Sequence, residues 1–133
     1  MEKTLVIIKP DGVKRGLIGE IIKRYERKGL KIIDCKMVQA DREILQKHYD
    51  EHKGKDFYEE LLTYMMSGKI LVMILEGENA IQIVRKIHGK TNPVDADIGT
   101  IRGDFANSTT QNIVHASDSK ESSEREIFIW FSR

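Results

Sequence analysis

The chain has 133 residues, the length of one domain, and we expect residues 1–133 to form a single domain. Its 22 Lys and Arg residues balance 21 Asp and Glu residues, so the net charge is +1, which argues against duplex nucleic acid or an anionic membrane as the main partner. The single cysteine, Cys35, excludes an internal disulfide, and no Cys/His spacing indicates a metal site.

The apolar segments are short. The run at residues 5–8 is too brief for a signal peptide, and the longest stretch, residues 70–75, is far below the length needed to cross a bilayer. These lengths predict a cytoplasmic protein without a membrane segment.

Strands and helices are predicted to alternate along the first third of the chain. The β-branched apolar run at 4–8 predicts a strand, which Lys9-Pro10-Asp11-Gly12 closes as a turn. Apolar residues recur at helical spacing from 17 to 25 and predict a helix. A second strand is expected at 31–39, with Cys35 as a buried residue on it.

The middle of the chain continues the alternation. Asp41 is expected to cap a helix at 42–52, and another helix is expected at 57–66. The apolar run at 70–75 predicts a fully buried strand, and Asn79 is expected to cap the helix after it.

A long polar loop separates these elements from the last two. Residues 90 to about 110 form no predicted strand, and a loop of this length inside a compact domain is usually functional. Residues 100–105 are long enough to form one helical turn within this loop. A strand ending at 113–116 and a helix at 120–130 complete the chain.

This order of elements predicts the fold class. It fits an α+β fold with a ferredoxin-like (split βαβ) four-stranded antiparallel sheet and helices packed on it. A doubly wound parallel sheet is the alternative.

The most informative segment surrounds His115. The two-residue period of a strand places His115 and Ser117 on one face, while Val114 and Ala116 face a core. A helix that starts near residue 120 can return Glu126 to the same face. Imidazole, hydroxyl and carboxylate together are typical of an oriented nucleophile, whereas a lone histidine more often only ends a strand.

Three cationic residues are candidates for binding an anion. Lys9 ends the first strand, Arg85 lies on the fourth predicted helix, and Arg102 is close to two glycines that let backbone approach an anion. Each alone is more typical of a solvated surface. Because no Walker loop and no GxGxxG motif follows the first strand, bound phosphates must be held by separate side chains.

Several motifs then occur in a recognisable order: Lys9-Pro10-Asp11-Gly12-Val13, Thr91-Asn92-Pro93, Gly99-Thr100-Ile101-Arg102-Gly103-Asp104-Phe105, Asn112 to Ser119, Glu124-Arg125-Glu126-Ile127 and Trp130-Phe131. In these motifs, and from end to end, the chain resembles the nucleoside diphosphate kinases.

The resemblance implies an activity. The terminal phosphoryl group of a nucleoside triphosphate, mainly ATP, would pass to nucleoside diphosphates by a ping-pong mechanism through a phosphohistidine on His115, maintaining NTP and dNTP pools with little base selectivity. Ser117 and Glu126 would orient the His115 ring, Lys9 would reach the transferring phosphate, and Tyr49 would lie beside the phosphates.

The resemblance also implies how the nucleotide is held, at positions that match the family. Arg85, Thr91 and Arg102 would bind phosphates, Lys9 and Asn112 the sugar hydroxyls, and Phe57, with Leu61 alongside, the base. Stacking on Phe57 would tolerate every base, since each base has a π face.

Mg²⁺ would arrive with the nucleotide, held mainly by phosphate oxygens and water rather than by a protein metal site. The partners implied are nucleoside tri- and diphosphates and further copies of the chain, with a hexamer favoured over a tetramer; no membrane or nucleic acid is required. The family often has proline before Gly-Thr-Ile-Arg-Gly, where this chain has Ile98, and the chain ends at Arg133 without the longer tail of many eukaryotic members.

Two other classes use some of the same features. A histidine phosphocarrier would also expose one histidine, but it would not need the sugar and base set of Lys9, Asn112 and Phe57. A ferredoxin-like nucleic-acid-binding module would show aromatic residues on central strands and a basic face, whereas these strands are aliphatic.

Overall fold

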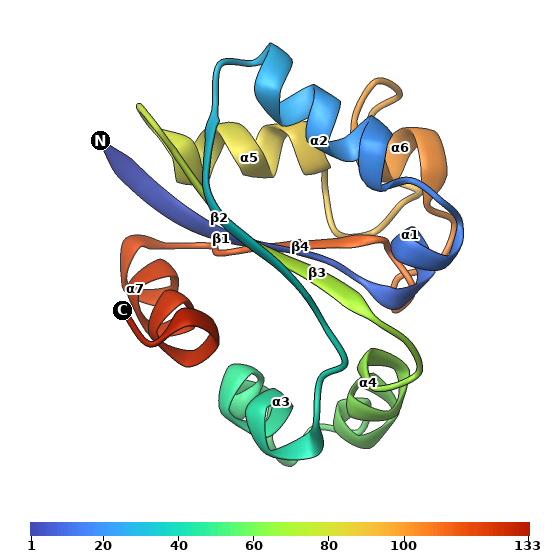
Figure 1. Ribbon diagram of the computed structural model, residues 1–133. Coiled ribbons are helices and arrows are strands. Elements are labelled where there is room, and N and C mark those ends of the chain that lie inside the picture. Colours follow the sequence, from blue (N-terminus) through green and yellow to red (C-terminus); the bar gives the residue numbers. More distant parts are fainter.

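The computed structural model describes residues 1–133 and contains one four-stranded antiparallel sheet (Figure 1). The strand order is β2-β3-β1-β4, and the bounds are β1 (Glu2–Ile8), β2 (Lys31–Val38), β3 (Ile70–Gly77) and β4 (Val114–Ala116). The predicted α+β, split βαβ arrangement is therefore confirmed, and the doubly wound parallel alternative is wrong.

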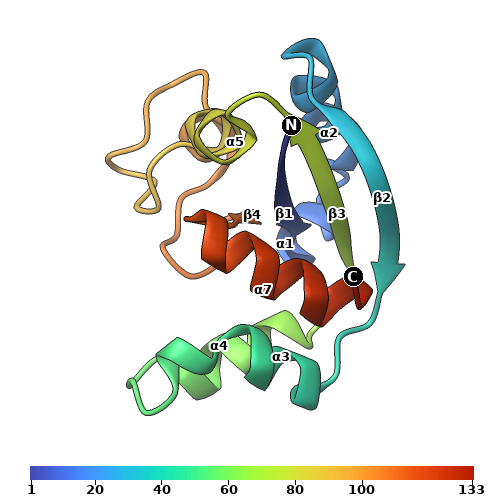
Figure 2. The same cartoon turned by 90° about the vertical axis from the view of Figure 1, so that its left-hand side faces the viewer.

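Helices cover both faces of the sheet (Figures 1 and 2). Their bounds are α1 (Pro10–Lys14), α2 (Ile18–Arg27), α3 (Arg42–His48), α4 (Tyr58–Met65), α5 (Ala80–His88), α6 (Ile101–Phe105) and α7 (Lys120–Phe131), with a 3₁₀ turn at Asp50–His52. Helices α2, α5 and α6 lie on one face, and α3, α4 and α7 on the other. None of the helices is both long and apolar enough to span a bilayer.

Strand β1 is apolar on both sides because it lies between these two helical layers. Leu5 and Ile7 are fully buried in the core that includes Trp130 of α7. Val6 and Ile8 are fully buried in the opposite core, which includes Tyr25 of α2. A continuous apolar run is the pattern expected for a strand covered on both faces.

Some predicted boundaries are wrong in informative ways. The predicted turn after β1 is instead the start of α1, because Pro10 occupies a first-turn position whose N–H makes no intrahelical bond. The helix predicted at 42–52 ends at His48 and continues as the 3₁₀ turn. Asn79 does not cap α5 with its side chain; it adopts a left-handed φ of 53°, and the Glu2 carboxylate accepts the Ile81 N–H at 2.9 Å instead.

The structure corrects one prediction in the edge strand β2 and confirms another in the long loop. Cys35 is exposed, not buried, because β2 is an edge strand and many of its side chains stay accessible. The loop contains the single helical turn considered above, α6, which begins where the Thr100 hydroxyl accepts the Gly103 N–H at 2.9 Å. Ile98 is 85% exposed in the same loop.

A strained residue precedes β4. Ile113 has a φ of 76°, and the Val114 N–H donates to the Asn112 carbonyl at 2.8 Å, which closes a three-residue γ-turn around Ile113. Such a conformation costs a β-branched residue about 1–3 kcal/mol. The buried Ile113 side chain and the bond from the Lys9 N–H to the Ile113 carbonyl, 2.7 Å, hold it in place. The turn thereby brings Asn112 beside the end of β1.

Candidate active site

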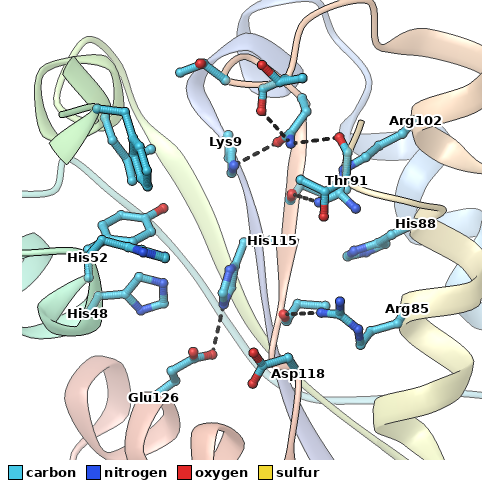
Figure 3. Close-up of a pocket in the computed structure, with 18 of the residues that line it drawn as sticks. Lys9, His48, His52, Arg85, His88, Thr91, Arg102, His115, Asp118 and Glu126 are labelled. Carbon is cyan, nitrogen blue, oxygen red and sulfur yellow. Dashed lines mark hydrogen bonds and ion pairs between the residues drawn. The ribbon is translucent and has the colours of Figure 1, made fainter. Parts of the chain in front are cut away.

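A pocket of about 500 Å³ opens at the carboxyl end of β1, between the two helical layers. Its volume suits a small ligand. The lining contains every position that the resemblance assigned to the nucleotide, together with the predicted nucleophile and carboxylate: Lys9, Tyr49, Phe57, Leu61, Arg85, Thr91, Arg102, Asn112, His115 and Glu126. Residues from α3, α4, α5, α6, β4 and α7 thus meet in one place, together with Lys9, which follows β1 (Figure 3).

The structure brings Ser117 and Glu126 together with His115, as predicted, and Glu126 is the residue that links the other two. The His115 Nε2 lies 2.9 Å from Glu126 Oε1, and the Ser117 hydroxyl donates to the same oxygen at 2.7 Å. Ser117 is fully buried and accepts the Leu5 N–H at 3.2 Å, so it is fixed to β1. Ser117 therefore positions Glu126, and Glu126 positions the imidazole.

The ionisation of Glu126 defines the tautomer of His115. Burial alone would raise the pKa of this carboxyl, but the hydrogen bonds from His115 and Ser117, with the charges of His115 and His48, together hold the pKa below its ordinary value. An ionised carboxylate only accepts hydrogen bonds, so Nε2 of a neutral His115 carries the proton and donates it. The lone pair is then on Nδ1. His115 is partly exposed, with 20% of its side chain accessible to the pocket side.

Lys9 is the buried cation of the site. Its Nζ donates to Asn112 Oδ1 at 2.8 Å, and the Asn112 amide donates in turn to the Thr109 carbonyl at 3.0 Å. Burial, followed by the nearby charge of Arg102, lowers the pKa of Lys9 to about 8. Lys9 is thus still mainly charged at neutral pH and has no carboxylate partner within ion-pair distance.

Two arginines lie on the side of the pocket formed by α5 and α6 (Figure 3). Arg102 donates from Nη1 to the Gly89 carbonyl at 2.8 Å and from Nη2 to the Val114 carbonyl at 2.6 Å. Burial and the charge of Arg85 lower the pKa of Arg102 to about 10, so it remains charged at neutral pH. Neither arginine forms a salt bridge, which leaves both charges available to an anion.

The remaining predicted residues surround the same volume. Tyr49 is buried, and its hydroxyl has no hydrogen-bond partner in the protein. Phe57 lies immediately before α4 and is 45% exposed, with its ring centroid 5.4 Å from that of His52. Leu61 and Thr91 line the pocket, Leu61 on α4 and Thr91 in the long loop. Only Ser117 lies outside the lining.

Sequence reasoning gave no role to His48, which the structure places against the nucleophile. The two imidazole centroids are 4.6 Å apart with nearly perpendicular rings. The Trp130 indole N–H donates to His48 Nδ1 at 3.0 Å, so a neutral His48 carries its proton on Nε2. Its position directly before Tyr49 was the available signal, but the contact with His115 depends on how α3 packs against β4.

Three carboxylates line the pocket, those of Glu51, Asp118 and Glu126, but they do not converge as one metal site. The group of side chains close enough to share a metal is His48, His115 and Glu126, which offers two imidazoles and one carboxylate. Mg²⁺ prefers six oxygens, and Trp130 already occupies one nitrogen of His48. This group is therefore a poor match for an Mg²⁺ ion held by protein side chains alone.

Two fully buried histidines predict an acid limit to stability. Burial, then the charge of His115 for His48 and of Arg102 for His88, holds both pKa values well below the ordinary 6.5. Below pH 6.5 the unfolded chain takes up protons that the folded protein excludes, so the free energy of unfolding should fall as pH falls, by up to about 1.4 kcal/mol per pH unit for each histidine. Urea unfolding between pH 7.5 and 5.5 measures this slope. His88→Leu should reduce it by the share of one histidine, and an unchanged slope would contradict the assignment.

The chain matches one protein family along almost its whole length. The family model described as Nucleoside diphosphate kinase matches residues 2–133. A nucleoside diphosphate kinase of Methanocaldococcus jannaschii is 61% identical over 130 residues, which cover 98% of this chain and 93% of that protein. One from Caldanaerobacter subterraneus is 62% identical over 131 residues, covering 98% and 94%.

Solved structures of nucleoside diphosphate kinases superpose closely on this chain. The apo nucleoside diphosphate kinase of Encephalitozoon cuniculi superposes with a TM-score of 0.98 at 46% identity, covering 100% of this chain and 90% of that one. The Halobacterium salinarum enzyme in complex with CDP has a TM-score of 0.96 at 43% identity, covering 99% and 88%.

Proposed function

The chain belongs to the nucleoside diphosphate kinase family and catalyses phosphoryl transfer between nucleotides, and from this premise we propose that Nδ1 of His115 carries the phosphoryl group from one nucleotide to the next. The observation that carries the proposal is the bond between His115 Nε2 and Glu126, which leaves Nδ1 as the free nucleophilic nitrogen. We also propose that residues 1–133 act as one catalytic domain.

The reaction has two balanced halves. In the first, the Nδ1 lone pair forms a bond to the terminal phosphorus of a nucleoside triphosphate, while the bond to the bridging oxygen breaks and the diphosphate leaves with that electron pair. In the second, a terminal oxygen of another diphosphate attacks the same phosphorus, and the electron pair returns to Nδ1. Nε2 keeps its proton throughout and donates it to Glu126, whose negative charge offsets the positive charge that develops on the ring.

Charge stabilisation comes from Lys9, Arg85 and Arg102, all of which line the pocket. The transferred group spreads negative charge over its oxygens, so fixed cations lower the barrier without chemical participation. Tyr49, beside α3, and Thr91, in the long loop, add uncharged hydroxyls to the lining, and Lys9 and Asn112, already bonded to each other, would bind the sugar hydroxyls. Mg²⁺ bound to the phosphates would neutralise part of their charge.

The experiment that tests the proposal separates the two halves. Protein incubated with ATP labelled in its terminal phosphate should become labelled, and unlabelled GDP added afterwards should remove the label as GTP. Direct transfer between two bound nucleotides would give GTP without labelled protein, and would contradict a histidine intermediate.

Base tolerance rests on Phe57, whose half-exposed ring stands at the pocket mouth. Stacking on one aromatic ring is worth roughly 1–3 kcal/mol and does not depend on base edges. Phe57→Ala should therefore weaken ADP, GDP, CDP and UDP to a similar degree, as measured by calorimetry. Phe128→Ala removes a more exposed ring from α7 outside the pocket and should leave all four affinities unchanged. A loss confined to purines after Phe57→Ala would contradict base-independent stacking.

The assembly stays a prediction, with a hexamer favoured over a tetramer. What supports self-association is the exposed apolar side chains of Val94 and Ile98 in the long loop, 90% and 85% accessible. Contact between this loop and another copy of the chain would remove both side chains from water.

A further inference from the structure

Tyr25 and His88 form a buried polar pair behind the pocket. Tyr25 of α2 is fully buried, and its hydroxyl lies 2.5 Å from Nε2 of His88, the last residue of α5. His88 is 1% exposed and borders the pocket, and Figure 3 shows it between Arg85 and Arg102. The catalytic scheme above uses neither residue.

The chemistry of the pair is defined by burial. Burial raises the pKa of Tyr25 far above its ordinary value, so its hydroxyl keeps the proton and must donate it. The one hydrogen-bond partner of that hydroxyl is His88 Nε2, which therefore accepts, and the His88 proton is on Nδ1. His88 remains neutral because burial and the charge of Arg102 lower its pKa.

The pair is connected to Arg102 through the end of α5. Gly89 follows His88 with a φ of 85°, a conformation that favours glycine, and its N–H donates to the Arg85 carbonyl at 3.0 Å. The Gly89 carbonyl accepts from Arg102 Nη1 at 2.8 Å. Tying His88 to α2 thus fixes the turn whose carbonyl holds one side of the Arg102 guanidinium, while Val114 of β4 holds the other.

The neutral state of His88 leaves the positive charges near it available to an anion. Tyr25 of α2 bonds His88, and the charges of Arg102, His115, Arg85 and Lys9 each lower the pKa of His88. A carboxylate here would neutralise Arg102 and compete with phosphate, whereas a neutral hydrogen bond fixes α5 without using that charge. Arg102 Nε and His88 Nδ1 are also both buried without a protein acceptor, as expected beside a site for anions.

We propose that Tyr25 and His88 are positioning residues for phosphate binding, which hold Arg102 in its binding orientation through the last turn of α5. The inference rests on the proposed role of Arg102 as a phosphate ligand.

The test measures affinity and stability separately. Dissociation constants for ADP with Mg²⁺ and for pyrophosphate, which has no base or sugar, are determined by calorimetry and competition, alongside urea unfolding. His88→Leu and Tyr25→Phe should each weaken both ligands by about threefold to tenfold. His88→Gln, whose amide oxygen can accept at the place of Nε2, should retain near wild-type affinity.

The double variant Tyr25→Phe/His88→Leu separates positioning from stability. It removes both polar partners, so stability should recover relative to the single variants while both ligands stay weakly bound. Glu2→Ala is the matched control, because it removes a hydrogen bond from the opposite end of α5 and should lower stability without weakening either ligand.

Three results would overturn the proposal: unchanged affinity in both single variants, recovery of affinity together with stability in the double variant, or equal weakening by Glu2→Ala. Failure of the proposed function gives a different result. If Arg102→Gln binds pyrophosphate as tightly as the wild-type protein does, Arg102 is not a phosphate ligand, whatever the Tyr25 and His88 variants do.

Discussion

Replacing His115 by alanine is expected to abolish both labelling of the protein by ATP and phosphoryl transfer, lowering the transfer rate on the order of 10³-fold or more. The reason is that His115 hydrogen-bonds a carboxylate through one ring nitrogen, at 2.9 Å, and keeps the other nitrogen free, whereas the Glu51 carboxylate lies 3.9 Å from His52 Nε2, beyond hydrogen-bond distance. Labelled wild-type protein should lose its label in acid and keep it in alkali, as a phosphoramidate does. The measurement is protein-bound label after denaturation, with rates from a coupled assay.

The control is another histidine of the same pocket. His52 contacts the rings of Tyr49 and Phe57 and has no contact with Glu126, so His52→Gln should still become labelled. A thermal melt of His115→Ala should show a cooperative transition, since the residue is partly exposed. Label found on His48, His52 or His88 would move the intermediate away from His115 and refute the assignment.

Replacing Lys9 by alanine should reduce kcat/KM by about 10²–10³-fold, the usual loss when one preorganised charge is removed from a transition state. The same residue should set the alkaline limb of the wild-type profile. Its pKa is lowered to about 8, so the positive charge is present below pH 8 and is lost as the pH rises through that value. We therefore expect kcat/KM to decline above about pH 8.

Lys9→Arg separates the charge from the rest of the side chain. Arginine keeps its charge throughout this range, so the variant should have a lower kcat/KM at pH 7, because its fork does not match the Asn112 contact, but no decline near pH 8. An alkaline limb that stays at the same pH in Lys9→Arg would assign the titration to another group. The profile is measured at low nucleotide concentration, where it reports the free enzyme.

The sequence predicted the features that neighbouring residues decide, which are the positions of helices and the residues that share a strand face. Apolar periodicity located the major helices, and strand alternation placed Ser117 beside His115 correctly. Helix α1 was missed because Pro10-Asp11-Gly12 is equally typical of a turn, and only contact with the neighbouring elements decides between them.

Long-range geometry could not be obtained in the same way. The bond between Lys9 and Asn112 joins residues 103 positions apart, and the approach of His48 to His115 depends on helix packing. The exposure of Cys35 follows from the position of β2 at the edge, which strand propensity does not reveal. The pair of Tyr25 and His88 had no sequence signal, since each residue alone fits an amphipathic helix.

The position of β4 has a consequence for how the protein matures during synthesis. Strand β1 is made first, yet one of its two neighbours, β4, consists of residues 114–116 near the other end of the chain. Until the ribosome releases those residues, Val6 to Ile8 present an unpaired apolar edge, the kind of surface that joins other chains into aggregates. A chain truncated before Val114 would lack the nucleophile and keep that edge exposed, so it should be found in the insoluble fraction. Recovery of such a truncated chain as soluble monomer would show that α7 and β4 are not needed to protect β1.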